Sequence, residues 1–370
     1  MKLVKKVLTY SIVFALGFAV VLGFNQIKSK NKPQKKEPIK TLLMFQGQGS
    51  QFLGMGKDLS KKYSSAKAVF DEVDEVLGKN FTQKIIFGDD INELTKGYNN
   101  QPALMAYAVA TYSALKEKYG EKLNELNIQG VAGNSLGDYS SLCVSSGLDV
   151  GEMAKLLRAR GKYMSECAQN QKDGLQEMSA IVGSNYETIK TEIEKLKNKT
   201  KVLVISNSNS FSQIVVSGYK QDIEKLVENL KKENENIKIY ELKVEGAFHS
   251  PLMEQARAKF EPELEKLNIK ELKYPMLQSA SKTFETDWNV VKQNLKYQIT
   301  EPVYWREMIQ TALNEGFNTF IEFGNKKVLS KFVESIAKQE GKQVKTILVG
   351  NVEDVENFFE NLNKESDYTE

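Results

Sequence analysis

The sequence Gly133-Asn-Ser-Leu-Gly137 has the G-x-S-x-G spacing that places a nucleophilic serine on a sharp turn between a strand and a helix. The apolar run Ile128–Gly133 precedes it, and small residues follow it. Glycines at both ends allow a tight turn and close packing of the helix on the strand. The motif predicts that Ser135 is a nucleophile and that the main-chain amide of Leu136, at a helix N-terminus, faces an oxyanion. A buried turn serine without chemistry is the alternative.

A serine nucleophile needs a base, and the chain contains one histidine, His249. Ser250 and Pro251 suit the N-cap and first turn of a helix that begins directly after it. Because a helix N-terminus disfavours imidazolium, the ring is expected to stay neutral and able to accept a proton. A histidine at a loop–helix junction with no catalytic role is the alternative, and contact with Ser135 decides between them.

The composition excludes several other functions. A formal charge of +3 and a hydrophobic fraction of 41% are ordinary for a globular protein and do not suggest nucleic-acid binding. The two cysteines, Cys143 and Cys167, lack C-x-x-C spacing, so neither a disulfide framework nor a metal site is expected, and a reducing compartment fits best. A single histidine also excludes a multi-histidine metal site.

An apolar run of roughly 18 residues, 7–24, lies between lysine-rich segments near the N-terminus, close to the lower limit for a membrane-spanning helix. Its end lacks the small residues of a signal-peptide cleavage site. The sequence therefore predicts an uncleaved single-pass membrane anchor and basic linker in residues 1–40. A signal peptide and a peripheral extension are the alternatives. More lysines follow the run than precede it, which favours a cytoplasmic catalytic domain.

Strands and helices alternate in the pattern after residue 40, which predicts a mainly parallel sheet with helices on both faces. Strands are expected at 41–45, 128–133, 318–323 and 346–349, and helices at 60–77, 101–119, 151–168, 251–267 and 305–315. Within 174–244 the order becomes β-α-β-β-α-β, which is typical of a ferredoxin-like unit. The predicted fold is α/β, with a hydrolase-like large subdomain (41–173 and 245–352), the inserted ferredoxin-like subdomain and a C-terminal tail (353–370).

Eight short motifs follow one another along the chain: FQGQGSQ (45–51), NQPA (100–103), GNSLGDY (133–139), RARGKYM (158–164), NSNSFSQIVVSG (207–218), GAFHSPLM (246–253), QITEPVYW (298–305) and EFG (322–324). In these motifs and their order, the chain resembles the malonyl-CoA:acyl carrier protein transacylases, acyltransferases of fatty acid and polyketide synthesis, over about residues 40–351. The resemblance implies transfer of a malonyl group from malonyl-CoA to the phosphopantetheine thiol of acyl carrier protein, without a cofactor or metal. A monomer is expected.

The resemblance also implies roles for individual residues. Ser135 matches the acylated serine and His249 its general base, in a dyad whose histidine is oriented by the main-chain carbonyl of Gln298. The oxyanion hole falls on the main-chain amides of Gln48 and Leu136, where flanking glycines let the main chain approach the substrate.

Arg160 matches the arginine that holds the free carboxylate of the malonyl group. A planar guanidinium grips a carboxylate with two parallel hydrogen bonds, which lysine cannot do. A solvated helix arginine, like Arg158, is the alternative, and the glycine that follows Arg160 favours the functional interpretation. Ala247-Phe248-His249 resembles the form found in malonyl-selective members.

Three positions depart from the family pattern. Asn134 stands where the family usually has histidine, Gln46 replaces a proline, and residues 324–327 replace a Gly-Pro-Gly-Lys-like turn. Asparagine cannot titrate, so reduced or altered activity is expected. Two other functions stay open: a serine thioesterase or esterase, in which water replaces the carrier thiol, and a catalytically weak scaffold.

Overall fold

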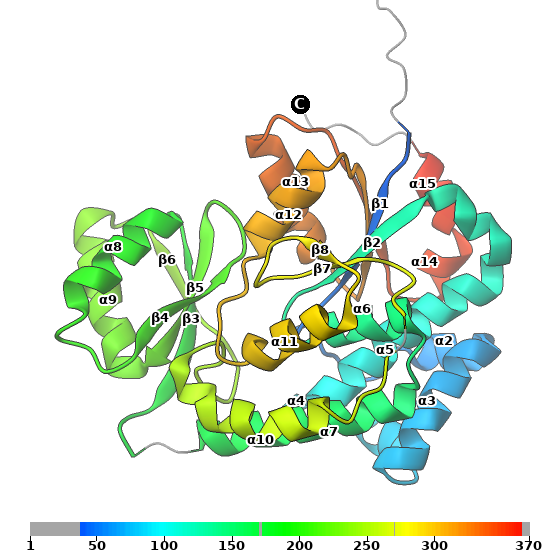
Figure 1. The fold of residues 1–370 in the computed structure, drawn as a ribbon, viewed down its shortest axis with the longest axis horizontal. Helices are drawn as coiled ribbons and strands as arrows, with labels where there is room; N and C mark the ends of the chain where they lie inside the picture. The colour runs from blue at the N-terminus through cyan, green and yellow to red at the C-terminus, as the bar shows by residue number, and fades with distance from the viewer. Residues whose placement is uncertain (1–37, 170–171, 270, 365–370) are drawn as a thin grey trace, which may run out of the picture. The chain divides into compact units, whose positions relative to one another are not determined.

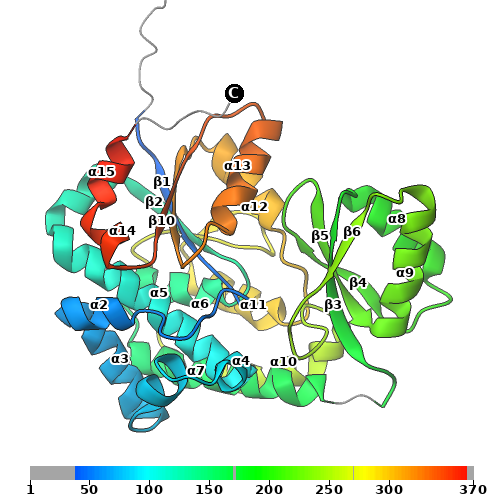
Figure 2. The same ribbon diagram turned by 180° about the vertical axis from the view of Figure 1, so that it is seen from behind.

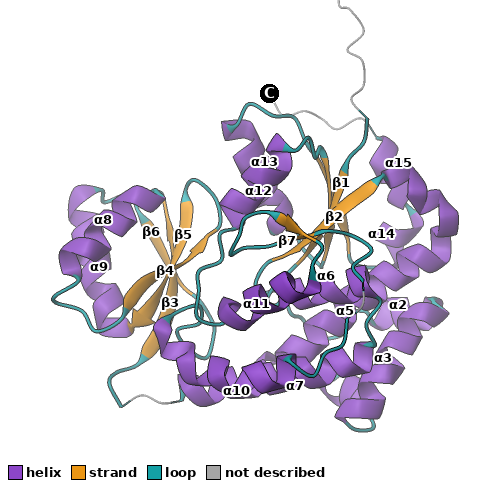
Figure 3. Cartoon of the chain, in the orientation of Figure 1, coloured by secondary structure: helices purple, strands orange, loops and turns teal. Residues whose placement is uncertain are grey.

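The structure is a computed structural model that describes residues 38–169, 172–269 and 271–364. The chain divides into two units, Met1–Pro38 and Ile39–Glu370, and all elements below belong to the second. This unit contains two sheets with helices packed against both (Figures 1 and 3). The predicted α/β fold is confirmed.

The larger sheet has six strands in the order β10-β9-β1-β2-β7-β8. All neighbours pair in parallel except β7 and β8. The strands are β1 (Thr41–Phe45), β2 (Ile128–Gly133), β7 (Met276–Leu277), β8 (Phe284–Glu285), β9 (Thr319–Phe323) and β10 (Lys345–Val349). Every residue of β1 and β9 is buried, as the inner strands of a parallel sheet covered on both faces must be.

Successive residues of β1 face two different hydrophobic cores, because side chains alternate across a strand. Leu43 and Phe45 join a core built with the helices that include α3, α5, α7 and α10, whereas Leu42 and Met44 join a core built with α12 and α13. Figure 2 shows α12 and α13 on one side of the sheet and α5 and α6 on the other. The helices of this body are α2 (Lys57–Lys62), α3 (Ser64–Leu77), α4 (Ile91–Thr95), α5 (Gly97–Tyr119), α6 (Gly137–Ser146), α7 (Val150–Ala168), α10 (Glu254–Leu264), α11 (Trp288–Gln298), α12 (Trp305–Asn314), α13 (Leu329–Gln339), α14 (Val352–Glu356) and α15 (Phe358–Asn363).

The smaller sheet is antiparallel, with the strand order β4-β5-β3-β6, and helices α8 and α9 cover one of its faces (Figures 1 and 2). This is the ferredoxin-like arrangement that the β-α-β-β-α-β order predicts. Its elements are β3 (Gln176–Val182), α8 (Tyr186–Leu196), β4 (Leu203–Ser208), β5 (Gln213–Tyr219), α9 (Lys220–Glu233) and β6 (Lys238–Glu241). It has a separate core of buried aliphatic side chains.

Several hydrogen bonds attach this subdomain to the segments that carry the site. Ser208 in β4 donates its main-chain N–H to Val303, and Ser217 in β5 donates its hydroxyl to the main-chain oxygen of Phe248, at 2.6 Å. Phe248 directly precedes the only histidine, so the inserted subdomain helps to fix the position of that ring.

Three stretches differ from expectation. Helices α11 and α13 were not predicted. The segment expected to be a C-terminal tail contains α14 and α15, and Phe358 is fully buried in the larger core. Apolar side chains separated by charged ones, as in this segment, pack as short amphipathic helices when a neighbouring core is available.

The predicted single-pass anchor is wrong for the described chain: no helix within residues 38–169, 172–269 and 271–364 is long and apolar enough to cross a bilayer. The apolar run 7–24 lies outside the described residues. The predicted membrane contact and cytoplasmic catalytic domain depend on that anchor, so neither is supported.

Candidate active site

The serine motif forms a sharp turn between β2 and α6. Ser135 has a left-handed main chain, with φ 54°. A Cβ added to Gly133 would lie 1.9 Å from the main-chain carbon of Gly137, and one added to Gly137 would lie 2.1 Å from the oxygen of Phe45. Only glycine fits at either position, because each contact is with main chain that cannot move aside. The turn therefore presents Ser135 at the carboxyl end of a central parallel strand.

The histidine lies directly against this serine. The Oγ of Ser135 is 2.7 Å from Nε2 of His249. On the other side of the ring, Nδ1 is 2.8 Å from the main-chain oxygen of Gln298 and 3.1 Å from that of Glu301. Two carbonyls require a donor, so Nδ1 carries the proton and Nε2 is left to accept the one on Oγ. This is the geometry of a nucleophile and its general base.

The environment keeps the ring neutral. Burial lowers the pKa of His249 to about 4, and the positive charge of Arg160 acts in the same direction. The carbonyls of Gln298 and Glu301 partly oppose the shift. The sequence attributes neutrality to a helix that begins after the histidine. The structure has a three-residue turn there, Pro251–Met253, which leads directly into α10, and burial is the largest cause of the lowered pKa.

Arg160 lies fully buried on α7, with amide groups as its hydrogen-bond partners. Nη1 donates to Oε1 of Gln101 at 2.8 Å, and Nη2 donates to Oε1 of Gln298 at 3.0 Å. The guanidinium also lies 5.1 Å from the ring centroid of Tyr139. No carboxylate forms an ion pair with it within the described part of the chain. A buried cation paired only with neutral groups is costly, and an anionic ligand reduces that cost.

Gln298, the last residue of α11, connects these groups. Its main-chain oxygen contacts His249, and its side-chain oxygen accepts from Arg160. Its side-chain nitrogen donates to the main-chain oxygen of Ser135 at 2.9 Å and to Oδ2 of Asp138 at 2.5 Å. One residue thus touches the serine turn, the histidine, the arginine and a buried carboxylate.

The two amides expected at an oxyanion lie on segments that meet beside Ser135. Leu136 is buried at the N-cap of α6, where helix N–H groups lack partners within the helix. Gly47, just before Gln48, approaches the serine turn so closely that an added Cβ would lie 2.4 Å from the main-chain oxygen of Asn134. The side chain of Gln48 accepts from Gln101 at 3.3 Å.

Residues 42–369 match a family model described as an acyl transferase domain. The chain belongs to the acyl transferase family. The predicted resemblance is confirmed by a relative as well. This acyl transferase is 35% identical over 328 residues to the malonyl CoA-acyl carrier protein transacylase of Bacillus subtilis (strain 168), covering 89% of this chain and 99% of the relative.

Solved structures agree with this assignment. The acyl transferase matches the crystal structure of an acyl-carrier-protein-S-malonyltransferase from Bartonella henselae with a TM-score of 0.79 and 32% identity, over 88% of this chain and 99% of the other. It also matches a malonyl-transacylase bound to its type II PKS acyl-carrier protein, with a TM-score of 0.78 and 27% identity, over 87% and 99% of the two chains.

Two departures from the family pattern lie together in this acyl transferase. Nε2 of Gln46 donates to Oε1 of Glu322 and to the main-chain oxygen of Lys326, both at 2.5 Å. A Cβ added to Gly324 would lie 2.1 Å from Cδ of Gln46. The altered residues at 46 and 324–327 thus contact each other, and they join the segment before Gly47 to the turn after β9.

Sequence reasoning missed Asp138 and Gln101 as neighbours of the acyl transferase site, although both stand in the quoted motifs. Their side chains are polar and buried, which shows only once the helices are placed. Among the described residues, no group of three or more histidine, cysteine or acidic side chains lies close enough to hold a metal ion. Burial raises the pKa of the Cys143 thiol, so it is a poor nucleophile.

Proposed function

We propose that this chain transfers a malonyl group from malonyl-CoA to the phosphopantetheine thiol of an acyl carrier protein, through a malonyl ester on Ser135. The 2.7 Å contact between Ser135 Oγ and His249 Nε2 carries the proposal, because it joins a nucleophile to a neutral base. The names of the relatives, and the solved complex of a malonyl-transacylase with its carrier protein, support the choice of donor and acceptor.

In the first half-reaction, Nε2 of His249 takes the proton of Ser135 as Oγ attacks the thioester carbonyl. The carbonyl oxygen becomes an oxyanion that faces the amides of Leu136 and Gln48. The C–S bond then breaks, and coenzyme A leaves as a thiol with the proton that His249 had taken. The main-chain carbonyls of Gln298 and Glu301 stabilise the transient imidazolium through Nδ1.

Arg160 holds the free carboxylate of the malonyl group in this scheme. A guanidinium has five N–H groups, and the two hydrogen bonds to Gln101 and Gln298 leave others to donate to the substrate. Its Nε has no partner among the residues that the structure describes. Two hydrogen bonds from the guanidinium to the carboxylate fix the malonyl group relative to Ser135. They also select the malonyl group over neutral acyl groups.

In the second half-reaction the carrier thiol gives its proton to His249 and attacks the malonyl ester. The malonyl thioester forms, and Ser135 recovers its proton from His249. Neither half-reaction changes an oxidation state, so the proposed chemistry uses no cofactor. A thioesterase would use the same dyad with water as the second nucleophile, and no observation favours it.

Labelled malonyl-CoA tests this function in the presence and absence of phosphopantetheinylated acyl carrier protein. Malonyl-carrier formation that exceeds the release of free malonate is the expected result. Free malonate as the main product, with carrier protein in excess, would identify a hydrolase. Failure to form either product with a correctly folded protein would identify a scaffold, which the Asn134 departure makes worth testing.

A further inference from the structure

Asp138 is a buried carboxylate that the proposed reaction does not use. It lies in the first turn of α6, three residues after the nucleophile, and only 3% of its surface is exposed. Its Oδ2 accepts a 2.5 Å hydrogen bond from Nε2 of Gln298. No lysine or arginine forms an ion pair with it in residues 38–169, 172–269 and 271–364. Its one direct side-chain partner there is Gln298.

The contacts of Gln298 depend on which way its side-chain amide faces. The oxygen end meets Arg160, and the nitrogen end meets Asp138 and the main-chain oxygen of Ser135. A guanidinium only donates, whereas an ionised carboxylate only accepts. The amide therefore satisfies both neighbours in one orientation alone, and turning it over would set N–H against N–H at Arg160 and oxygen against oxygen at Asp138.

We propose that Asp138 is a positioning residue for the malonyl group: it holds the side-chain amide of Gln298 in the orientation that keeps Arg160 in place for the substrate carboxylate. This inference rests on the proposed function. The contact of Gln298 with His249 uses the main-chain oxygen instead, so Asp138 affects carboxylate recognition separately from the dyad.

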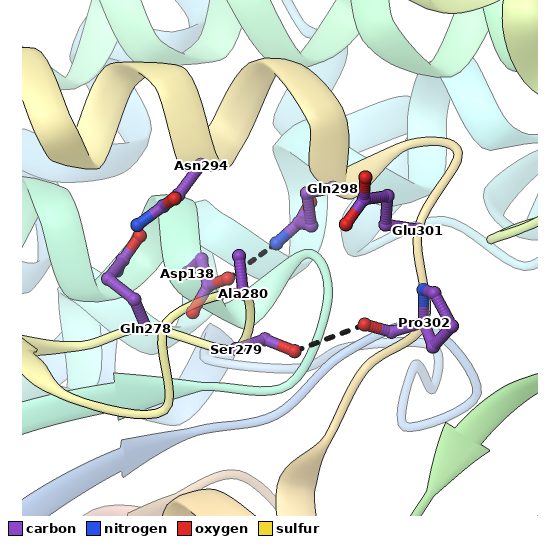
Figure 4. Close-up of a pocket in the computed structure, with 8 residues that line it drawn as sticks. All are labelled: Asp138, Gln278, Ser279, Ala280, Asn294, Gln298, Glu301 and Pro302. Carbon is purple, nitrogen blue, oxygen red and sulfur yellow. Dashed lines mark hydrogen bonds between the residues drawn. The ribbon is translucent and has the colours of Figure 1, made fainter.

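The surroundings of Asp138 favour this role. A cavity of about 10 Å³ lies beside it, lined by Gln278, Asn294 and Gln298 among others (Figure 4). Figure 4 shows the side chains of Gln278 and Asn294 pointing toward one another across this space. The side-chain nitrogens of both are buried and have no hydrogen-bond partner within the described ranges. Oδ1 of Asp138 likewise has none there. The buried carboxylate therefore relies on Gln298 as its hydrogen-bond partner among the described side chains.

Acylation kinetics of Asp138→Asn test the proposal, with malonyl-CoA and acetyl-CoA compared. The variant keeps the volume but can present an N–H₂ group to Gln298. The KM for malonyl-CoA should rise about tenfold with kcat within about threefold, since roughly one charge-assisted hydrogen bond is lost. Acetylation of Ser135 should change less than about threefold. Equal losses with both substrates, or no loss with malonyl-CoA, would overturn the proposal.

Gln298→Leu provides a second test that leaves Asp138 unchanged. It removes the side-chain amide and retains the main-chain oxygen that faces His249, so it should reproduce the selective malonyl defect. Adding Asp138→Asn to Gln298→Leu should cause no further rise in the KM for malonyl-CoA, because the side chain through which Asp138 acts on Arg160 is already absent. Losses that multiply in the double variant would show that Asp138 acts by another route. If instead the unaltered protein forms no malonyl-Ser135, the proposed function itself fails.

Discussion

Ser135 and His249 meet at 2.7 Å, and both have a left-handed main chain, with φ of 54° and 55°. That conformation costs an L-residue roughly 1–2 kcal/mol. The fold holds both in place: the glycines at 133 and 137 admit no side chain at the serine turn, and His249 donates its main-chain N–H to Ile299. Strain at two residues that touch is typical of a site whose geometry matters more than its local stability.

Replacing Arg160 tests the carboxylate role. Arg160→Ala should lower the malonylation rate of Ser135 about 10²–10³-fold, since two charge-assisted hydrogen bonds are lost, and should lower acetylation far less. Arg160→Lys should recover little, because an ammonium lacks the planar fork. The measurement is kcat/KM for acylation with each CoA ester.

Arg158 offers a matched control for this prediction. It lies two residues earlier on α7 and packs over the rings of Phe81 and Tyr98. Arg158→Ala should leave the malonyl-to-acetyl ratio unchanged even if the protein loses stability. The carboxylate role is wrong if Arg160→Ala also leaves that ratio unchanged.

The pKa of His249 predicts a pH dependence of stability. Burial lowers it to about 4, against 6.5 in the unfolded chain, so between these values the unfolded chain binds a proton that the folded chain lacks. The free energy of unfolding should therefore rise from pH 4 to 6.5 on account of this group, by up to about 3 kcal/mol. Urea unfolding of the parent and His249→Gln at both pH values measures it, and parallel curves would contradict it.

Asp138 should contribute to the pH dependence of stability with the opposite sign. Burial raises its pKa to about 7, whereas the amide of Gln298 and the charge of Arg160 lower it less strongly. Between pH 3.8, the ordinary pKa of an aspartate, and about 7, the folded chain therefore binds a proton that the unfolded chain lacks, and stability falls as pH rises through that window. Because His249→Gln leaves Asp138 in place, the comparison with the parent isolates the histidine.

The structure brings together Ser135, His249, Arg160 and Gln298, all named from the sequence, whereas the sequence does not point to Asp138 or Gln101. Ser135 and His249 are recognisable because glycine spacing and a single imidazole leave few alternatives. Asp138 shows no such signal, because an aspartate in the first turn of a helix ordinarily suggests an exposed residue facing the helix dipole. Its burial depends on α11, whose residue Gln298 contacts it although the two residues are 160 positions apart in the chain.

Glu322 should contribute more to stability than Gln46, its partner. Its carboxylate accepts the main-chain N–H groups of Val328, Leu329 and Ser330, at 3.0, 2.8 and 2.8 Å, at the start of α13. Glu322→Ala leaves these buried donors unpaired and should lower the free energy of unfolding by about 3–5 kcal/mol. Gln46→Ala removes the two hydrogen bonds that its Nε2 donates, to Glu322 and to Lys326, and should cost about 1–2 kcal/mol. Equal losses in urea unfolding would show that this assignment is wrong.

Gly161 should be intolerant of a side chain because α5 and α7 touch there. An added Cβ would lie 2.2 Å from the main-chain oxygen of Gly97, so Gly161→Ala must separate the helices and displace Arg160. We expect a loss of at least about 3 kcal/mol in the free energy of unfolding, together with a reduced malonyl-to-acetyl ratio.

Gly147→Ala is the control for that substitution. It has φ +65° and no atom within 4 Å of an added Cβ, so it should cost only about 1 kcal/mol of backbone strain and leave the substrate ratio unchanged. A Gly161→Ala protein as stable as the Gly147→Ala protein would contradict the close helix contact.

The helices and strands divide in the same way. Some are predicted by local sequence signals, and others depend on residues that are distant in the chain. Strands β1 and β2 match their predicted bounds, and helix α7 begins one residue before its predicted start, because their apolar patterns are strong and their end signals are clear. Helix α13 was missed, since its N-terminus is capped by Glu322, which is seven residues from Leu329 in the chain and has no recognisable capping spacing.

The most direct measurement of the central claim is the mass of the protein after brief incubation with malonyl-CoA in the absence of any carrier protein. A single malonyl adduct that maps to the peptide containing Ser135, is absent from Ser135→Ala, and disappears when phosphopantetheinylated carrier protein is added is the predicted result. An unmodified protein, or an adduct that maps to any other residue, would contradict the account.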